Sequence, residues 1–118
     1  MANAETKNLS SPDETRKFTN GKLEVVNIGG GTVGRSVFEP GWKWSNDVKP
    51  IAGTELCEAP HFLYQVSGNM RIRMKDGHEF DIGPGDVAMI PPGHDGWVVG
   101  NETCVAIDWS GAANYAKK

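Results

Sequence analysis

Closely spaced turn signals restrict this chain to short secondary-structure elements. Groups rich in glycine and proline recur along it: Gly29-Gly30-Gly31, Pro40-Gly41, Ser67-Gly68-Asn69, Asp76-Gly77, Gly83-Pro84-Gly85-Asp86, Pro91-Pro92-Gly93 and Gly100-Asn101. The segments between them are rich in β-branched and aromatic residues, which favour strands over helices. We therefore expect an all-β chain of antiparallel strands, arranged as a jelly roll or barrel.

The expected strands cover Leu23–Ile28, Arg35–Phe38, Phe62–Val66, Met70–Met74, Val87–Ile90, Trp97–Val99 and Val105–Trp109. The segment Met70–Met74 alternates between apolar residues and arginines, so its methionines and Ile72 should face inward. Asp76-Gly77 then predicts a hairpin turn.

The length of 118 residues is enough for one domain with a single core. Residues 1–20 are polar, which predicts a surface arm, and residues 21–118 should form the barrel. The 12 Lys and Arg residues against 15 Asp and Glu, a net charge of -3, leave no basic stripe for a phosphate backbone. Nucleic acid is therefore not an expected partner.

The absence of long apolar runs argues against a membrane-spanning segment, since crossing a bilayer takes about 20 apolar residues. The polar start of the chain also lacks a signal-peptide pattern, and we expect a cytoplasmic protein. In a reducing compartment Cys57 and Cys104 should remain free thiols, unless Cys57 is a metal ligand.

Two polar clusters point to a metal site. The stretch from Gly85 to His94 combines a turn, a short apolar run and a second turn that ends on a histidine. Upstream, Glu55, Cys57 and His61 are spaced so that alternate residues of an extended chain could face one cavity. Together they predict a metal site inside a small barrel.

The spacing of these residues resembles the two motifs of the cupin superfamily, over about residues 34–109. The second motif, G-x5-P-x-G-x2-H-x3-N, matches Gly85, Pro91 and Gly93, but Gly96 stands at its histidine position and His94 lies two residues earlier. Gly100 stands at its asparagine position, with Asn101 adjacent.

In the first motif, G-x5-H-x-H-x3/4-E-x6-G, counting back from Gly68 places His61 at the glutamate position. Cys57 and Glu55 then occupy the two histidine positions. The resemblance implies a cupin-type jelly roll with Glu55, Cys57, His61 and His94 as metal ligands. This donor set suits Zn²⁺ first, and could hold Fe²⁺, Ni²⁺ or Cu²⁺.

Each candidate ligand also has a simpler interpretation. Cys57 and His61 could be interior residues of a strand, because both types occur in cores. Glu55 could be an exposed loop carboxylate, and His94 a surface histidine, since two residues along a strand span about 6.8 Å. His78, beside the hairpin turn, is expected to be exposed and is no candidate.

Two further residues are candidates for a substrate pocket. Gln65 should share the inward face of its strand with His61, where it would either bind substrate or be satisfied by the backbone. Trp42 and Trp44 lead towards the ligand strand, and Trp44 in particular could form a pocket wall.

Three functions remain open at this point. The chain could be a metal-dependent enzyme acting on a small polar metabolite, of oxygenase, isomerase or lyase type, although no catalytic residue can be named. It could instead be a non-catalytic module or sensor that binds a metal or a small-molecule ligand. In a third reading the pocket is vestigial and the chain acts through its surface. The resemblance also implies a homodimer, formed through an apolar outer strand face to which Trp97 and Trp109 could contribute.

Overall fold

The structure is a computed structural model that describes residues 3–110 and 115–116. Its strands are β1 (Glu14–Phe18), β2 (Gly21–Ile28), β3 (Gly31–Phe38), β4 (His61–Ser67), β5 (Asn69–Met74), β6 (Glu79–Ile82), β7 (Val87–Ile90), β8 (His94–Val99) and β9 (Cys104–Asp108). Two single-turn helices, α1 (Trp44–Asp47) and α2 (Lys49–Ala52), lie between β3 and β4.

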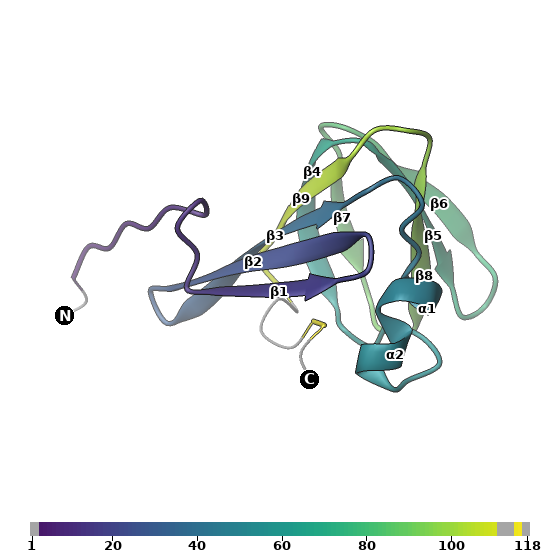
Figure 1. The fold of residues 1–118 in the computed structure, drawn as a ribbon, viewed down its shortest axis with the longest axis horizontal. Coiled ribbons are helices and arrows are strands. Elements are labelled where there is room, and N and C mark those ends of the chain that lie inside the picture. The colour runs from purple at the N-terminus through teal and green to yellow at the C-terminus, as the bar shows by residue number, and fades with distance from the viewer. Residues whose placement is uncertain (1–2, 111–114, 117–118) are drawn as a thin grey trace.

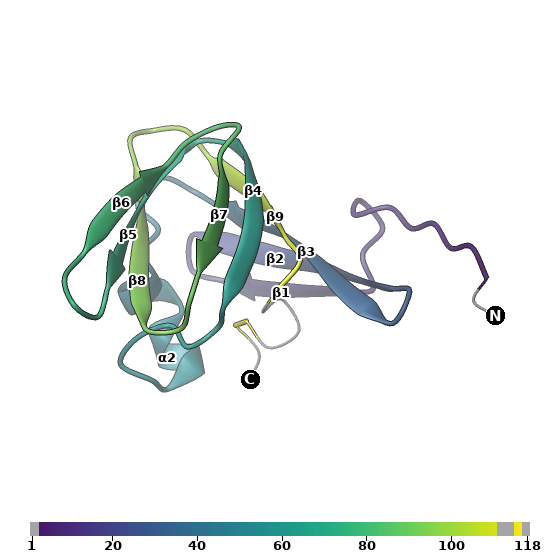
Figure 2. The ribbon, with the colours of Figure 1, turned by 180° about the vertical axis from the view of Figure 1, so that it is seen from behind.

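The strands form two antiparallel sheets that close around an interior (Figure 1). The larger sheet has the order β1-β2-β3-β9-β4-β7, and the smaller one the order β6-β5-β8. Viewed from behind, β7 and β4 stand beside the smaller sheet, with α2 at the lower end of the barrel (Figure 2). The expected all-β, antiparallel jelly-roll architecture in one small domain is confirmed.

Side-chain alternation places the core between the sheets. On β5, Met70 and Ile72 are buried and the two arginines are exposed, as the alternation predicts. On β4, Leu63 and Gln65 are buried, whereas Phe62 and Tyr64 face outward. Burial of a large apolar side chain contributes about 2 kcal/mol of stability, so this repeated alternation holds the two sheets together.

The polar N-terminal segment contributes a strand. Strand β1 pairs with β2 over its whole length, and Arg16 is the one buried side chain on it. The expected arm over residues 1–20 is therefore too long, because the sheet begins at Glu14. An edge strand with a single inward side chain needs no apolar pattern, which is why composition did not reveal it.

Gly68, between β4 and β5, is required by its surroundings. Its φ is +75°, and a Cβ atom there would lie 2.5 Å from Sγ and 2.7 Å from Cα of Cys104. Only glycine fits this close approach of two backbones.

The helices among the described residues are a single turn each, far too short to cross a bilayer.

Candidate metal centre

Three potential metal ligands converge at one end of the barrel interior. Donor atoms of Cys57, His61 and His94 all lie within 4.8 Å of one another. Cys57 belongs to the loop before β4, His61 is the first residue of β4, and His94 is the first residue of β8. The loop is fixed to β8 because the Cys57 N–H donates to the His94 carbonyl at 2.7 Å, and the Gly93 N–H donates to the Cys57 carbonyl at 2.8 Å.

Asp108 orients the His61 ring. Its Oδ2 lies 2.5 Å from Nδ1 of His61, and the pairing of Leu63 with Asp108 across β4 and β9 brings the two side chains together. The other carboxylate oxygen accepts hydrogen bonds from the backbone N–H groups of Phe62 and Ser110. With Nδ1 engaged, Nε2 of His61 faces Sγ of Cys57 at 3.9 Å.

A backbone carbonyl orients the His94 ring in the same way. Nδ1 of His94 lies 2.9 Å from the Pro91 carbonyl oxygen, which can only accept, so Nδ1 carries a proton and, in the neutral ring, the lone pair is on Nε2. The rings of His61 and His94 are 5.1 Å apart, edge to face. Both imidazoles thus direct Nε2 towards the cluster, with the other nitrogen anchored as in protein metal sites.

The cluster changes the proton affinity of its members. Burial by itself would raise the pKa of Cys57, but hydrogen bonds from His61 and His94 outweigh it and lower that pKa to about 7. Burial would lower the pKa of His61, but Asp108 and Cys57 raise it to about 9. The Cys57 thiolate is the form that binds a metal, but a metal ion would have to displace the proton from Nε2 of His61, because only a neutral imidazole is a ligand.

The sequence profile described as the EutQ-like cupin domain matches residues 47–107, which is more than half of the chain. The chain belongs to this cupin family. A search of curated proteins gave no match for the sequence.

Solved structures support the same fold. A protein of unknown function from Rhizobium leguminosarum has a TM-score of 0.64 at 17% identity, covering 92% of this cupin and 97% of that chain. The polyketide cyclase RemF from Streptomyces resistomycificus has a TM-score of 0.63 at 17% identity, with 92% and 80% covered. An oxalate decarboxylase from Lactobacillus farciminis has a TM-score of 0.61 at 18% identity, covering 86% of this cupin and 32% of that chain.

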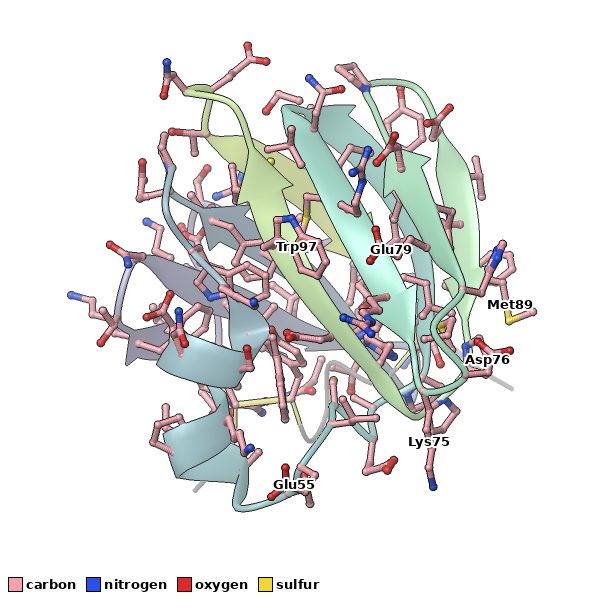
Figure 3. The ribbon with its side chains drawn as sticks, turned by 90° about the vertical axis from the view of Figure 1, so that its right-hand side faces the viewer. Glu55, Lys75, Asp76, Glu79, Met89 and Trp97 are labelled. Carbon is pink, nitrogen blue, oxygen red and sulfur yellow. The ribbon has the colours of Figure 1, made fainter. Side chains whose placement is uncertain are left out.

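The structure does not bring Glu55 to the cluster, which corrects the expectation that it is a ligand. Its side chain is 91% exposed on the loop after α2, and its carboxylate pairs with Nζ of Lys49 at 2.9 Å. Figure 3 shows Glu55 at the lower edge of this cupin, away from the barrel interior. Glu55 precedes Cys57, the residue at which the loop begins to pair with β8, so its side chain stays outside the barrel and the motif spacing misplaced it.

Gly96 is closely packed against the core, and the histidine of this cupin lies at position 94 instead. A Cβ atom at Gly96 would lie 2.9 Å from Cδ1 of Ile72, so a histidine there would displace a core side chain. His94 instead uses the turn at Gly93, whose φ is +94°, to enter the interior at the start of β8.

Gln65 and Trp44 both line the barrel interior, around a cavity of about 50 Å³ that also reaches Cys57, His61 and His94. Gln65 is fully buried, and its side-chain nitrogen donates to the Ser67 and Gly68 carbonyls at 3.0 and 3.2 Å. These two hydrogen bonds agree with the expectation that the backbone satisfies the Gln65 amide, at least for its nitrogen. His78 is exposed, as expected, and Cys57 and Cys104 are free thiols.

Two residues of the site were not anticipated from the sequence. Asp108 lies two residues after Ala106, on the same inward face of the expected strand. An acidic residue on an otherwise apolar face could have indicated that it belongs to the site. Tyr115 lies after the last strand, and its ring meets the His61 ring edge on at 5.6 Å. No periodicity could have placed Tyr115 there.

Proposed function

We propose that this cupin binds a divalent transition metal through Cys57, His61 and His94. The observation that carries the proposal is the convergence of three donors, two of which are imidazoles anchored through Nδ1. One thiolate and two imidazoles suit Zn²⁺ best, with Fe²⁺, Ni²⁺ and Cu²⁺ as alternatives, while a hard ion such as Mg²⁺ gains little from sulfur.

Three protein ligands leave a coordination position for a small molecule. Cys57, His61 and His94 would hold a zinc ion as a Lewis acid, which would polarise an oxygen atom of a bound ligand. The chain's own residues supply the apolar surroundings: the cavity is lined mostly by aliphatic and aromatic side chains such as Leu63, Ile72 and Ile90.

Binding of a small ligand is better supported than acid–base catalysis. Among the described residues that line the cavity, the titratable ones are Cys57, His61, His94, Asp108 and Tyr115. The first three are the proposed ligands, and Asp108 is committed to His61. We therefore infer a metal-dependent binding or sensor module, since a catalytic base needs a free group within reach of the substrate.

One observation favours the enzymatic alternative. Tyr115 lines the cavity, is not a proposed ligand, and places its ring edge on against the His61 ring at 5.6 Å. Burial raises the pKa of Tyr115 well above its ordinary value, so its phenol stays protonated and can orient a substrate by donating a hydrogen bond, although it is a weak acid. The similar folds of RemF and the oxalate decarboxylase show that enzymes use this barrel, but the reaction does not follow from the fold. Turnover of a small metabolite that is lost in Tyr115→Phe would support the enzyme.

Elemental mass spectrometry on protein purified without added metal or chelator tests the metal proposal. We expect near-stoichiometric zinc, iron, nickel or copper in the wild type and its loss in Cys57→Ala and His61→Ala. Cys104→Ala and His78→Ala serve as matched controls, because each removes the same residue type away from the cluster. Equal metal content in all five proteins would contradict the proposal.

We also propose that a second copy of this chain covers the outer face of β4 and β7. Every outward position there is apolar and exposed: Phe62, Tyr64, Val66, Val87 and Met89, with Trp109 beside them. These side chains present on the order of 500 Å² of apolar surface, given about 200 Å² for a fully exposed aromatic side chain. With its rim, such a patch approaches the about 800 Å² that each partner buries in a standard interface.

The expected contribution of Trp97 to that face does not fit the structure. Trp97 lies on the outer face of β8, on the smaller sheet, where Nζ of Lys43 sits 5.1 Å from its ring centre. Figure 3 shows Trp97 near the centre of the view, on the outer face of β8, and Met89 at the right-hand edge. The uncharged patch on β4 and β7 is suited to self-association about a two-fold axis.

A further inference from the structure

Two buried polar atoms in the barrel interior have no hydrogen-bond partner. Among the residues that the structure describes, they are Oε1 of Gln65 and Nε1 of Trp42. One is an acceptor and the other a donor, and both residues line the same cavity. Buried polar groups are nearly always paired, so the two atoms together indicate something that the cavity receives.

The orientation of the Gln65 amide is fixed by its surroundings. Its nitrogen donates to two backbone carbonyls, those of Ser67 and Gly68. Flipping the amide would turn its oxygen towards two acceptors, so the unpaired atom has to be the carbonyl oxygen. Gln65 therefore presents an acceptor that the protein itself leaves unused.

The indole of Trp42 is equally well held. Its ring stacks on Phe38, with centroids 3.8 Å apart and planes within 17°, and its side chain is almost fully buried. The backbone carbonyl of Trp42 accepts from the Val98 N–H at 3.0 Å. Trp42 thus presents a donor on a rigid support.

Both residues belong to the end of the barrel away from the metal cluster. Gln65 lies two inward positions beyond His61 on β4, and Val98, which holds Trp42, lies two inward positions beyond His94 on β8. Four residues of a strand span about 13 Å. Cys104 marks the same level, because it pairs with Phe38 and touches Gly68.

We propose that the deep end of the barrel is a binding subsite for a neutral group that both donates and accepts a hydrogen bond, such as a primary amide or a hydroxyl. The group donates to Oε1 of Gln65 and accepts from Nε1 of Trp42. This inference extends the proposed ligand-binding function and rests on it, but the subsite itself is made without the metal ligands.

Size and charge restrict the occupant further. A cavity of about 50 Å³ has room for about four non-hydrogen atoms. The side chains that line it and can carry a charge, Cys57 and His61 with Asp108, are at the other end. The walls between are aliphatic, including Leu63 and Ile72. A small, uncharged, largely apolar molecule therefore fits, and a sugar or a phosphate does not.

Acetamide is the probe that tests the subsite, because it has four non-hydrogen atoms, a donor and an acceptor. Acetone is its matched control, having the same size and acceptor but no N–H. We would follow the methyl signals of Leu63, Ile72 and Ile82 by NMR, and record metal content on the same samples. Acetamide should bind saturably, with a dissociation constant in the millimolar range expected for so small a ligand, and acetone at least about fivefold more weakly.

Trp42→Phe removes the donor and keeps a ring to stack on Phe38. It should weaken acetamide binding about five- to tenfold, as the loss of one hydrogen bond predicts. Trp97→Phe, the same change on the outer face, should leave binding unchanged. Three results would each overturn the subsite. Acetamide and acetone could bind equally well, or the two substitutions could have equal effects. Acetamide could also fail to bind, with an ordered water molecule alone bridging Gln65 and Trp42.

The same experiment separates the two proposals. Acetamide should bind equally well to wild-type protein with and without metal, because the subsite contains no metal ligand. Wild-type protein that is purified without metal and still binds acetamide would contradict the metal proposal and support the subsite. Protein that contains metal and does not bind acetamide would support the metal proposal and contradict the subsite.

Discussion

Asp108 holds His61 by a short contact of 2.5 Å between Oδ2 and Nδ1, from the neighbouring strand of the same sheet. The carboxylate is itself fixed by two backbone N–H groups, those of Phe62 and Ser110. The position and the tautomer of the His61 ring therefore depend on a residue that is not a proposed ligand. Such supporting residues commonly affect metal binding nearly as much as the ligands do.

Asp108→Asn should weaken metal binding by about 10- to 100-fold, because the amide no longer stabilises the Nδ1 proton of His61. The asparagine oxygen can still accept from the backbone, so the fold should be retained. Competition with a chromogenic zinc chelator measures the change. Asp81→Asn, at an exposed carboxylate paired with Arg71, is the control and should have no effect. Equal affinities in both variants would exclude the orienting role.

The metal-free protein should have almost the same stability between about pH 6.5 and pH 9. His61, with its pKa raised from 6.5 to about 9, contributes stability that is fully present below 6.5 and is lost as the pH rises through about 9. Cys57, with its pKa lowered from 9.0 to about 7, contributes stability that is present above 9.0 and is lost as the pH falls through about 7. The two effects have opposite signs over nearly one window and should cancel.

Cys57→Ala removes one of these effects and leaves His61 beside Asp108. Its free energy of unfolding should then fall as the pH rises from about 6.5 towards 9. Urea titrations of both proteins at several pH values, with chelator present, measure this. A wild type that depends on pH as strongly as the variant would contradict the coupling between Cys57 and His61.

Gly68→Ala should destabilise the barrel by about 3 kcal/mol or more, because the added methyl group would overlap Cys104 as well as straining a positive φ. Gly77→Ala is the matched control: its φ is +91°, but nothing lies within 4 Å of its Cβ position. It should cost only the backbone strain, about 1 to 2 kcal/mol. Denaturant unfolding compares them, and equal losses would show that the contact with Cys104 is unimportant.

Tyr64→Lys should convert a dimer into a monomer, because it places a charge at the centre of the apolar face of β4 and β7. Light scattering coupled to size-exclusion chromatography measures the mass. Val99→Lys changes an exposed apolar residue on β8 of the other sheet and should leave the dimer intact. A monomeric wild type at micromolar concentration would refute this interface.

The sequence predicted the parts of the fold that alternate. Strand β5 was expected close to its observed bounds because its inward and outward residues differ in polarity. Strand β4 was expected because it is rich in aromatic and β-branched residues. Strand β6 was missed, since Glu79–Ile82 is only four residues long and partly charged. Strand β1 was missed because an edge strand can be polar on both faces.

The candidate site was predictable where ligands share a strand or a motif. Cys57 and His61 follow from motif spacing, whereas His94 was proposed although it lies two residues before the motif's histidine position. The same spacing also proposed Glu55, whose side chain is exposed and paired with Lys49. Asp108 and Tyr115 meet His61 only through tertiary contacts, 47 residues away for Asp108. Contacts of that range depend on strand order, which a single sequence does not reveal.

Arg16 and Tyr115 connect opposite ends of the chain. Nη1 of Arg16 on β1 donates to the Tyr115 carbonyl at 2.7 Å, across 99 residues, and the Tyr115 ring lies against His61. The outermost strand of the larger sheet therefore fixes the segment that packs against a candidate ligand, although β1 itself does not contact the cluster. Fraying of β1 from β2 would release the Tyr115 backbone and expose the edge of the His61 ring, so a change at the rim of the sheet would be felt in the barrel interior.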